Sequence, residues 1–210
     1  MTLSLEFCRL GVRDYATTLV QMRDWTHTRQ PDTSDEIWFL EHSPVYTQGV
    51  SCRESVRDGG GDIPLLKSDR GGQITYHGPG QLVAYLLLDL RRLGLGVRQL
   101  VSLIETSLIT LLSQFGLSAV TRPRAPGVYV DGEKIAALGL RVRSGCCYHG
   151  LSLNVDMDLD PFSRINPCGF SDLRVTSLKA QGLTVTVDEA ADALQVILLA
   201  TLATSATGKI

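Results

Sequence analysis

One thiol in the sequence has the surroundings of a nucleophile. Cys168 lies between Pro167 and Gly169, so a predicted loop would hold its sulfur on a stiff turn with little bulk beside it. An ordinary thiol has a pKa of ~8.5 and is only a few per cent thiolate at neutral pH. Cys168 would therefore need a neighbouring group that stabilises the thiolate or accepts its proton.

The remaining cysteines have less telling surroundings. Cys8 lies in a predicted strand, as an inert thiol would, and Cys52 lies in the glycine-rich loop 51–62. Cys146 and Cys147 are adjacent and are predicted to flank a strand. Five cysteines without CxxC spacing indicate neither a disulfide framework nor a structural zinc site. We expect reduced thiols, as in the cytoplasm.

Three side chains are candidates to activate Cys168. Lys134 follows a predicted tight turn and begins a strand of small and apolar residues. It is either a solvated charge or, if it points inward, an amine that burial pushes toward its neutral, proton-accepting form. His77 and His149 are the alternatives, because histidine is the common partner of a catalytic thiol. The spacing leaves this choice open, and a metal site built from the two histidines and a thiol is a further alternative.

A glycine-rich segment could bind an anionic oxygen. It runs Arg70-Gly71-Gly72-Gln73-Ile74-Thr75-Tyr76-His77-Gly78-Pro79-Gly80-Gln81. Two glycines beside an arginine let the backbone approach a ligand closely and can aim N–H groups at an oxygen. The alternative is a hairpin in which the glycines only allow a bend and His77 is a hydrogen-bonded core residue.

The composition indicates the class of protein that positions these groups. With 210 residues, 44% hydrophobic and 20% charged, one α/β domain spanning residues 1–210 can bury a large core. The net charge of -2 lacks the basic excess of nucleic-acid binders. The N-terminus has no secretory pattern, and the apolar stretch around 193–203 is too short to span a bilayer. We expect a cytoplasmic protein that binds neither nucleic acid nor membrane.

Helices are predicted where apolar residues recur every three or four positions, and strands where they alternate or form short runs. Strands are expected around 3–7, Ile37–Leu40, Val45–Thr47, Gln73–Tyr76, Leu82–Leu90, Gly127–Val130, Glu133–Val142 and Tyr148–Val155. Helices are expected at 14–29 with Asp14 as cap, at 97–115 ending at Gly116, and from the capping box Thr186-Val187-Asp188-Glu189 to about Ala203.

These elements predict an α/β (α+β) fold, with a mixed, largely antiparallel sheet flanked by about three helices. A glycine-proline turn at 78–80 would join two of the strands, and Asp131-Gly132 would close a second hairpin. Local pairing of strands disfavours a doubly wound dinucleotide fold. Neither GxGxxG nor GxxxxGK[ST] occurs, so a classical phosphate loop is not indicated.

Four runs, in this order, carry a family resemblance: RGGQITYHGPGQL, RPRAPGVYVDGEKIAALGLRV, YHGLSLNVDMDL and INPCG. The chain resembles the octanoyltransferases of protein lipoylation, most densely from about Ile37 to Leu178. The resemblance implies a fold related to lipoate and biotin protein ligases. It implies a reaction in which a medium-chain acyl group, octanoyl in particular, passes from acyl carrier protein through a Cys168 thioester to a lysine of a lipoyl domain.

The resemblance also assigns roles to residues. Cys168 matches the acyl-bearing thiol and Lys134 the lysine that activates it. The substrate-binding positions that it implies are Arg70, Gly71, Gly72, Gln73, Ile74, Thr75, Tyr76, His77, Ala137, Leu138, Gly139, Gly150, Leu151 and Ser152. No cofactor or metal is implied, because conversion of a thioester to an amide is downhill and needs no ATP.

The implied partners are acyl carrier protein as donor, and as acceptors the lipoyl domains of 2-oxoacid dehydrogenase complexes and the glycine cleavage H protein. Three other functions stay open at this point. The chain could be an ATP-dependent lipoate or biotin protein ligase of the same fold, or a non-catalytic module that binds acyl groups or lipoyl domains. It could also be a thiol hydrolase that uses His149 as base.

Overall fold

The computed structural model describes residues 4–53, 56–123, 125–165 and 174–207. Seven strands form the main sheet, in the order β1-β2-β6-β10-β9-β8-β7. Their bounds are β1 Leu5–Arg13, β2 Asp35–His42, β6 Gln81–Asp89, β7 Ala119–Thr121, β8 Gly127–Val130, β9 Glu133–Arg143 and β10 Cys146–Asn154. Only β1 and β2 run parallel; the other neighbours are antiparallel. The predicted mixed, largely antiparallel sheet is confirmed.

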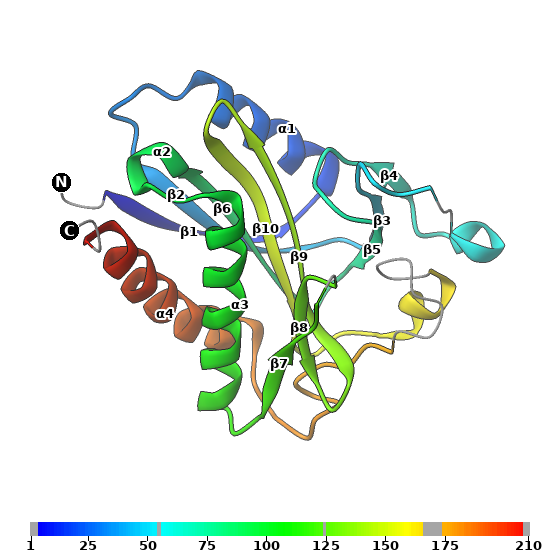
Figure 1. Ribbon diagram of the computed structural model, residues 1–210. Coiled ribbons are helices and arrows are strands. Elements are labelled where there is room, and N and C mark those ends of the chain that lie inside the picture. Colours follow the sequence, from blue (N-terminus) through cyan, green and yellow to red (C-terminus); the bar gives the residue numbers. More distant parts are fainter. Residues whose placement is uncertain (1–3, 54–55, 124, 166–173, 208–210) are drawn as a thin grey trace.

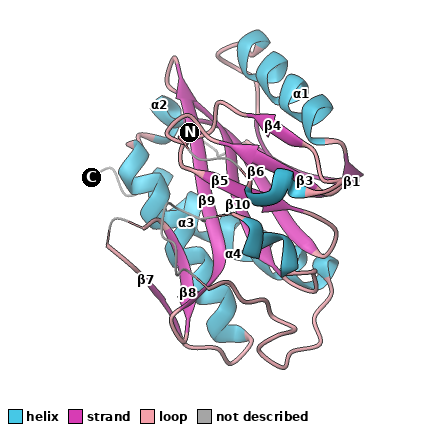
Figure 2. Cartoon of the chain, turned by 90° about the vertical axis from the view of Figure 1, so that its right-hand side faces the viewer, coloured by secondary structure: helices cyan, strands magenta, loops and turns pink. Residues whose placement is uncertain are grey.

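Three long helices flank this sheet, together with a short one. They are α1 Tyr15–Thr28, α2 Leu90–Leu93, α3 Val97–Gln114 and α4 Val187–Thr207. Figures 1 and 2 show α3 and α4 side by side on one face of the sheet, with α1 on the other. None of the helices in the described ranges is long and apolar enough to cross a membrane.

The central strand β6 explains how both faces are covered. Leu82, Ala84, Leu86 and Leu88 pack in the cluster that includes α3 and α4. The alternate residues Val83, Tyr85 and Leu87 pack in the cluster that includes α1. Because strand side chains alternate between faces, the nearly continuous apolar run at 82–90 is that of a strand buried on both sides.

A smaller three-stranded sheet, β4-β3-β5, lies beside the main one (Figure 1). Its strands are β3 Val45–Gln48, β4 Leu65–Lys67 and β5 Ile74–His77. The short 3-10 helices Arg57–Gly60 and Asp160–Arg164 complete the described elements. The predicted hairpin of β5 with β6 is wrong, because β5 pairs with β3 instead and β6 pairs with β2 and β10. The glycine-proline turn therefore passes the chain from one sheet to the other.

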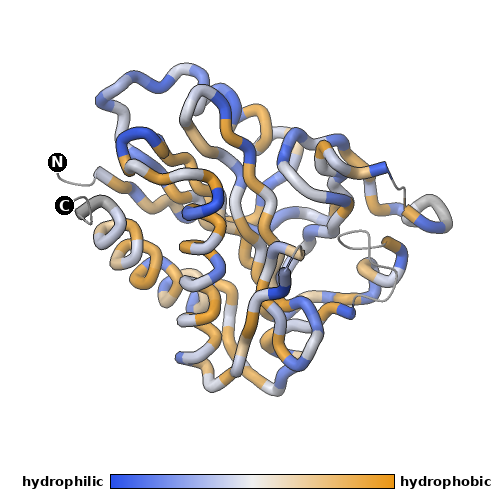
Figure 3. The backbone as a smooth tube through the Cα atoms, in the orientation of Figure 1, coloured by the Kyte–Doolittle hydropathy of each residue, from blue (hydrophilic) through white to orange (hydrophobic). Residues whose placement is uncertain are grey.

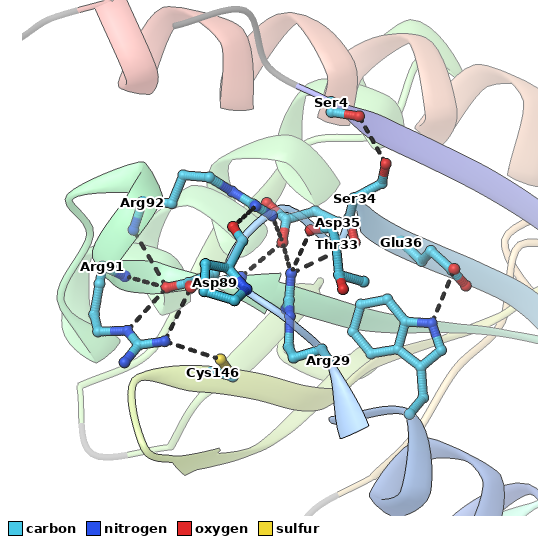
Figure 4. Close-up of polar contacts among 12 residues, drawn as sticks. Ser4, Arg29, Thr33, Ser34, Asp35, Glu36, Asp89, Arg91, Arg92 and Cys146 are labelled. Atoms are coloured by element: carbon cyan, nitrogen blue, oxygen red, sulfur yellow. Dashed lines mark hydrogen bonds and ion pairs between the residues drawn. The ribbon is translucent and has the colours of Figure 1, made fainter. Parts of the chain in front are cut away.

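The turn that joins α1 to β2 is hydrophilic (upper left of Figure 3), yet it is followed by a buried charge. Asp35 is fully buried, and its Oδ1 lies 2.8 Å from Arg29 Nη2 and 2.7 Å from Arg92 Nη2. The same oxygen accepts the backbone N–H of Asp89 at 2.7 Å (Figure 4). This cluster ties the turn to the end of β6 and the start of α2.

Candidate functional site

A cavity of about 420 Å³ opens between the small sheet, β9, β10 and the start of α3. Its volume lies in the usual range for small-molecule sites. Fourteen of the sixteen residues singled out by the sequence line it: Arg70, Gly71, Gly72, Gln73, Ile74, Thr75, His77, Lys134, Ala137, Leu138, Gly139, Gly150, Leu151 and Ser152. Three separate stretches of chain thus meet at one cavity.

Two of the singled-out residues are placed differently. Tyr76 is not among the residues that line the cavity; its ring packs against Tyr46 and Phe162, with centroids 5.5 and 5.6 Å away. Cys168 lies outside the described residues. Phe162, upstream of it, and Val175, downstream of it, both line the cavity.

Lys134 is buried, with 4% of its surface exposed, so of the two alternatives for this residue the solvated charge is wrong. Its Nζ lies 5.4 Å from the centre of the Tyr129 ring, at the distance of a cation–π contact. Gly127 leaves the space that the side chain occupies, since a Cβ there would lie 2.6 Å from Lys134 Cε and 3.1 Å from Nζ. Tyr129, which is fully buried, and Gly127 therefore shape the place of the amine.

The chain that follows Cys168 is bound to Lys134 through the backbone. The N–H of Lys134 donates to the carbonyl of Arg174 at 2.9 Å, and the N–H of Thr176 donates to the carbonyl of Lys134 at 2.9 Å. These bonds make Lys134 and Val175 parallel neighbours. The described chain therefore resumes, at Arg174, directly against the candidate lysine.

Two of the other cysteines, Cys8 and Cys147, are not activated thiols. The prediction that Cys146 and Cys147 flank a strand is wrong, because both lie within β10 and are buried. Burial raises the pKa of the Cys147 thiol well above its usual range. The pKa of Cys8 is also raised, by burial and by the nearby carboxylates Glu36 and Glu6. Both thiols stay protonated at neutral pH and are poor nucleophiles.

Arg70 holds the wall of the cavity and is itself buried. Its Nε donates to Thr47 Oγ1 at 3.1 Å, its Nη2 donates to the Thr47 carbonyl at 2.6 Å, and its Nη1 donates to the Gly71 carbonyl at 3.0 Å. The backbone N–H of Gly71 donates to the Leu140 carbonyl at 2.9 Å. The expectation that this N–H faces an anionic oxygen is therefore wrong for Gly71.

His77 is a hydrogen-bonded, neutral side chain at the cavity wall. Its Nδ1 lies 2.7 Å from Gln81 Oε1. The Gln81 amide nitrogen donates to Asn154 Oδ1 and to the Tyr76 carbonyl, so its oxygen is the acceptor for His77. Burial, with smaller contributions from His42 and Arg70, lowers the pKa of His77 to about 3. An imidazole with this pKa is a weak base at neutral pH.

His149 lies at a different part of the cavity from Lys134. Strand pairing sets His149 opposite Leu140, six positions along β9 from Lys134, which corresponds to about 20 Å at ~3.3 Å per residue. Its Nε2 lies 2.9 Å from Asp69 Oδ1. Asp69 was not singled out from the sequence, although a carboxylate directly before Arg70-Gly71-Gly72 was a usable signal. Nowhere in the described ranges do three or more His, Cys, Asp or Glu side chains gather as metal ligands would.

Comparison with known proteins identifies the family. The model of the lipoyl protein ligase A/B catalytic domain matches residues 14–198. An octanoyltransferase of Pseudomonas putida (strain W619) is 57% identical over 90% of this chain and 88% of its own length. An octanoyltransferase of Psychromonas ingrahamii is 54% identical over 88% of this chain and 86% of its own.

Solved structures agree in fold. A bipartite lipoate protein ligase from Thermoplasma acidophilum has a TM-score of 0.75 at 19% identity, over 96% of this chain and 84% of that one. A biotin protein ligase from Aquifex aeolicus has a TM-score of 0.58 at 14% identity, over 94% of this chain and 68% of that one. The predicted relation to these ligase folds is confirmed. The chain belongs to the lipoyl protein ligase A/B catalytic-domain family, within its octanoyltransferase group.

Proposed function

We propose that this chain transfers an octanoyl group from acyl carrier protein to a lysine of a lipoyl domain through a thioester on Cys168. One observation carries the proposal: a buried lysine at the wall of the cavity is hydrogen-bonded to the segment that follows Cys168. A thiol and an amine that lie close together form a nucleophile with its own proton acceptor, and this backbone pairing supports the proposal that Cys168 and Lys134 are such a pair.

The first half-reaction begins with proton transfer from Cys168 Sγ to Lys134 Nζ. The thiolate then attacks the carbonyl carbon of the octanoyl thioester. When the tetrahedral intermediate collapses, the bond to the carrier sulfur breaks and that sulfur takes the proton from the Lys134 ammonium. The products are the octanoyl thioester of Cys168, a neutral Lys134 and the free carrier thiol.

In the second half-reaction the acceptor lysine attacks the Cys168 thioester as a neutral amine. Lys134, now neutral, takes the proton that the attacking nitrogen loses, and the Cys168 thiolate leaves. The amide is formed and the thiolate–ammonium pair is restored. General base assistance of this kind typically contributes about 10²- to 10⁴-fold in rate.

The cavity supplies an apolar slot beside these groups. Val97 and Val101 at the start of α3 face the cavity together with Leu138, Leu140 and Leu151. Burial of each methylene contributes about 0.8 kcal/mol, so shorter chains bind more weakly by a gradual amount. We infer that acyl chains shorter than octanoyl are transferred progressively less well. The thiol chemistry suits a reducing compartment such as the cytoplasm.

The acceptors that we propose are the lipoyl domains of 2-oxoacid dehydrogenase complexes and the glycine cleavage H protein. Intact-mass analysis after mixing the protein with octanoyl-carrier protein tests the first step. We expect a gain of one octanoyl group on Cys168, its removal by hydroxylamine, and its transfer to an added lipoyl domain. Cys168→Ser should not be loaded, and Lys134→Gln should be loaded at least ~100-fold more slowly.

A matched arm of this experiment separates the proposal from an ATP-dependent ligase. The protein is incubated with free octanoate, ATP and lipoyl domain, and pyrophosphate release is followed. We expect no octanoylated domain in this arm. Modification that requires ATP, or full transfer activity in Cys168→Ser, refutes the proposal.

A further inference from the structure

Asp69 and His149 join two walls of the cavity. Asp69 directly precedes the cavity-lining stretch Arg70–Thr75, and His149 directly precedes Gly150–Ser152. The hydrogen bond of 2.9 Å between His149 Nε2 and Asp69 Oδ1 spans 80 positions of sequence. A displacement at either end of this bond is therefore passed to a wall of the cavity.

The protonation of the pair follows from its neighbours. Burial opposes ionisation of Asp69, but hydrogen bonds from His149, Tyr148 and Arg23 outweigh it and hold the pKa of the carboxyl far below its usual range. Tyr148 Oη donates to Asp69 Oδ2 at 2.6 Å, and Arg23 Nε donates to the same oxygen at 3.1 Å. A carboxylate only accepts hydrogen bonds, so the His149 proton lies on Nε2 and the lone pair on Nδ1.

The backbone at His149 departs from the strand in order to make this bond. Its φ is +59°, in the left-handed region that residues other than glycine rarely adopt. Successive side chains of a regular strand point to opposite faces, whereas Tyr148 and His149 both reach Asp69. Such a backbone conformation is costly unless surrounding contacts stabilise it. Here Asp69 supplies those contacts, because it accepts hydrogen bonds from both side chains.

His149 also lines the cavity directly. It is 1% exposed and lines the cavity, and its Nδ1 is buried without a hydrogen-bond partner among the described residues. Burial lowers the pKa of His149, although Asp69 opposes this, so the ring presents a neutral face. The distance of about 20 Å along β9 keeps this ring away from Lys134.

We propose that Asp69 and His149 are positioning residues for acyl transfer, whose hydrogen bond sets the Arg70–Thr75 wall against the Gly150–Ser152 wall. The inference rests on the proposed function. Loss of the bond loosens the cavity around the acyl group but leaves Lys134, about 20 Å away along β9, in place. It therefore weakens binding of the octanoyl donor more than it slows the chemical step, which is the pattern of lost uniform binding.

The test measures KM and kcat for octanoyl-carrier protein in wild-type protein and variants, beside the midpoint of thermal unfolding. His149→Leu fills similar space without a donor and is expected to raise KM about tenfold or more, with kcat within about twofold. His149→Gln restores an N–H donor and should return KM to within about threefold of wild type. Asp69→Asn keeps an accepting oxygen but loses the charge, and should raise KM by about threefold or more.

Tyr148→Phe is the matched control, because Tyr148 donates to the same carboxylate but does not line the cavity. It is expected to leave KM within about twofold. In a double-mutant cycle, Asp69→Asn with His149→Leu should be no worse than His149→Leu alone, since both act on one bond.

The proposal is overturned if His149→Leu keeps the wild-type KM, if kcat falls while KM does not change, or if Tyr148→Phe raises KM as much. Additive effects in the cycle overturn it as well. If His149→Leu does not fold, Asp69→Asn decides alone: a wild-type KM refutes the positioning role and a raised KM supports it. Absence of transfer in the wild-type protein would instead refute the proposed function.

Discussion

One carbon atom added at Gly127 is expected to displace Lys134. An ideal Cβ at this position lies 2.6 Å from Lys134 Cε and 2.6 Å from the Ala136 carbonyl oxygen. Ordinary carbon contacts begin near 3.5 Å, so the lysine side chain must retreat by about 1 Å, and the Ala136 carbonyl on the neighbouring strand must shift as well. A misplacement of about 1 Å can cost about 100-fold in rate. Gly127→Ala is therefore expected to load Cys168 about 100-fold more slowly.

The assay is single-turnover loading of Cys168 from octanoyl-carrier protein, followed by intact mass at a temperature where the variant is folded. Gly116→Ala is the matched control: Gly116 also has a positive φ, of +80°, but its Cβ would meet nothing within 4 Å. The control suffers backbone strain of about 1–2 kcal/mol and should keep the wild-type loading rate. If folded Gly127→Ala loads Cys168 as fast as wild type, the placement of Lys134 does not control the reaction and the reasoning fails.

Three further predictions concern stability. Asp35→Ala leaves the buried side chain of Arg29 and the partly buried one of Arg92 without their carboxylate, so the free energy of unfolding in urea should fall by about 3–5 kcal/mol; a loss below 1 kcal/mol would contradict this. Thr186→Ala removes the two hydrogen bonds that the Thr186 hydroxyl makes with Glu189 at the start of α4 and should lower the free energy of unfolding by about 1 kcal/mol; an unchanged value would contradict this. Burial lowers the pKa of His42 to about 4 and of His77 to about 3, whereas the unfolded chain titrates near ~6.5. Below that pH the unfolded state binds more protons than the folded state. The free energy of unfolding should therefore be constant above pH ~6.5 and fall toward pH ~4, by up to about 1.4 kcal/mol per pH unit for each histidine. A free energy of unfolding that does not change with pH in this range would show that the two histidines are not buried in their neutral form.

The helix ends and the hairpin turn that the sequence predicts correctly depend on interactions between residues close together in the chain. Asp14 caps α1 by accepting the N–H of Thr17 at 2.8 Å, and Gly116 follows α3 with the expected positive φ. Asp131 and Gly132 turn the β8–β9 hairpin with φ of +48° and +84°. Each of these signals acts within about four residues, so the sequence contains all the partners that decide it.

Pairing between distant segments is where local signals fail. The turn at 78–80 suggests a hairpin, but β5 finds its partner in β3, about 30 positions earlier. Cys146 pairs with Asp89 at the end of β6, which extends β10 two residues beyond its predicted start. The burial of Lys134 likewise depends on Tyr129 and on the returning segment at Val175. None of these partners can be identified from periodicity alone.

The cavity itself results from the different lengths of two neighbouring strands. β8 pairs with β9 only as far as the Gly127–Ala137 pair, whereas β9 continues to Arg143. Within the described ranges, the edge of β9 beyond Ala137 meets no further strand, and Gly71 binds it at Leu140. The glycine-rich loop can reach β9 because β8 is short. A longer β8 would pair with Leu138–Leu140 and displace the loop, so the length of an otherwise ordinary strand decides whether three distant motifs can enclose one cavity.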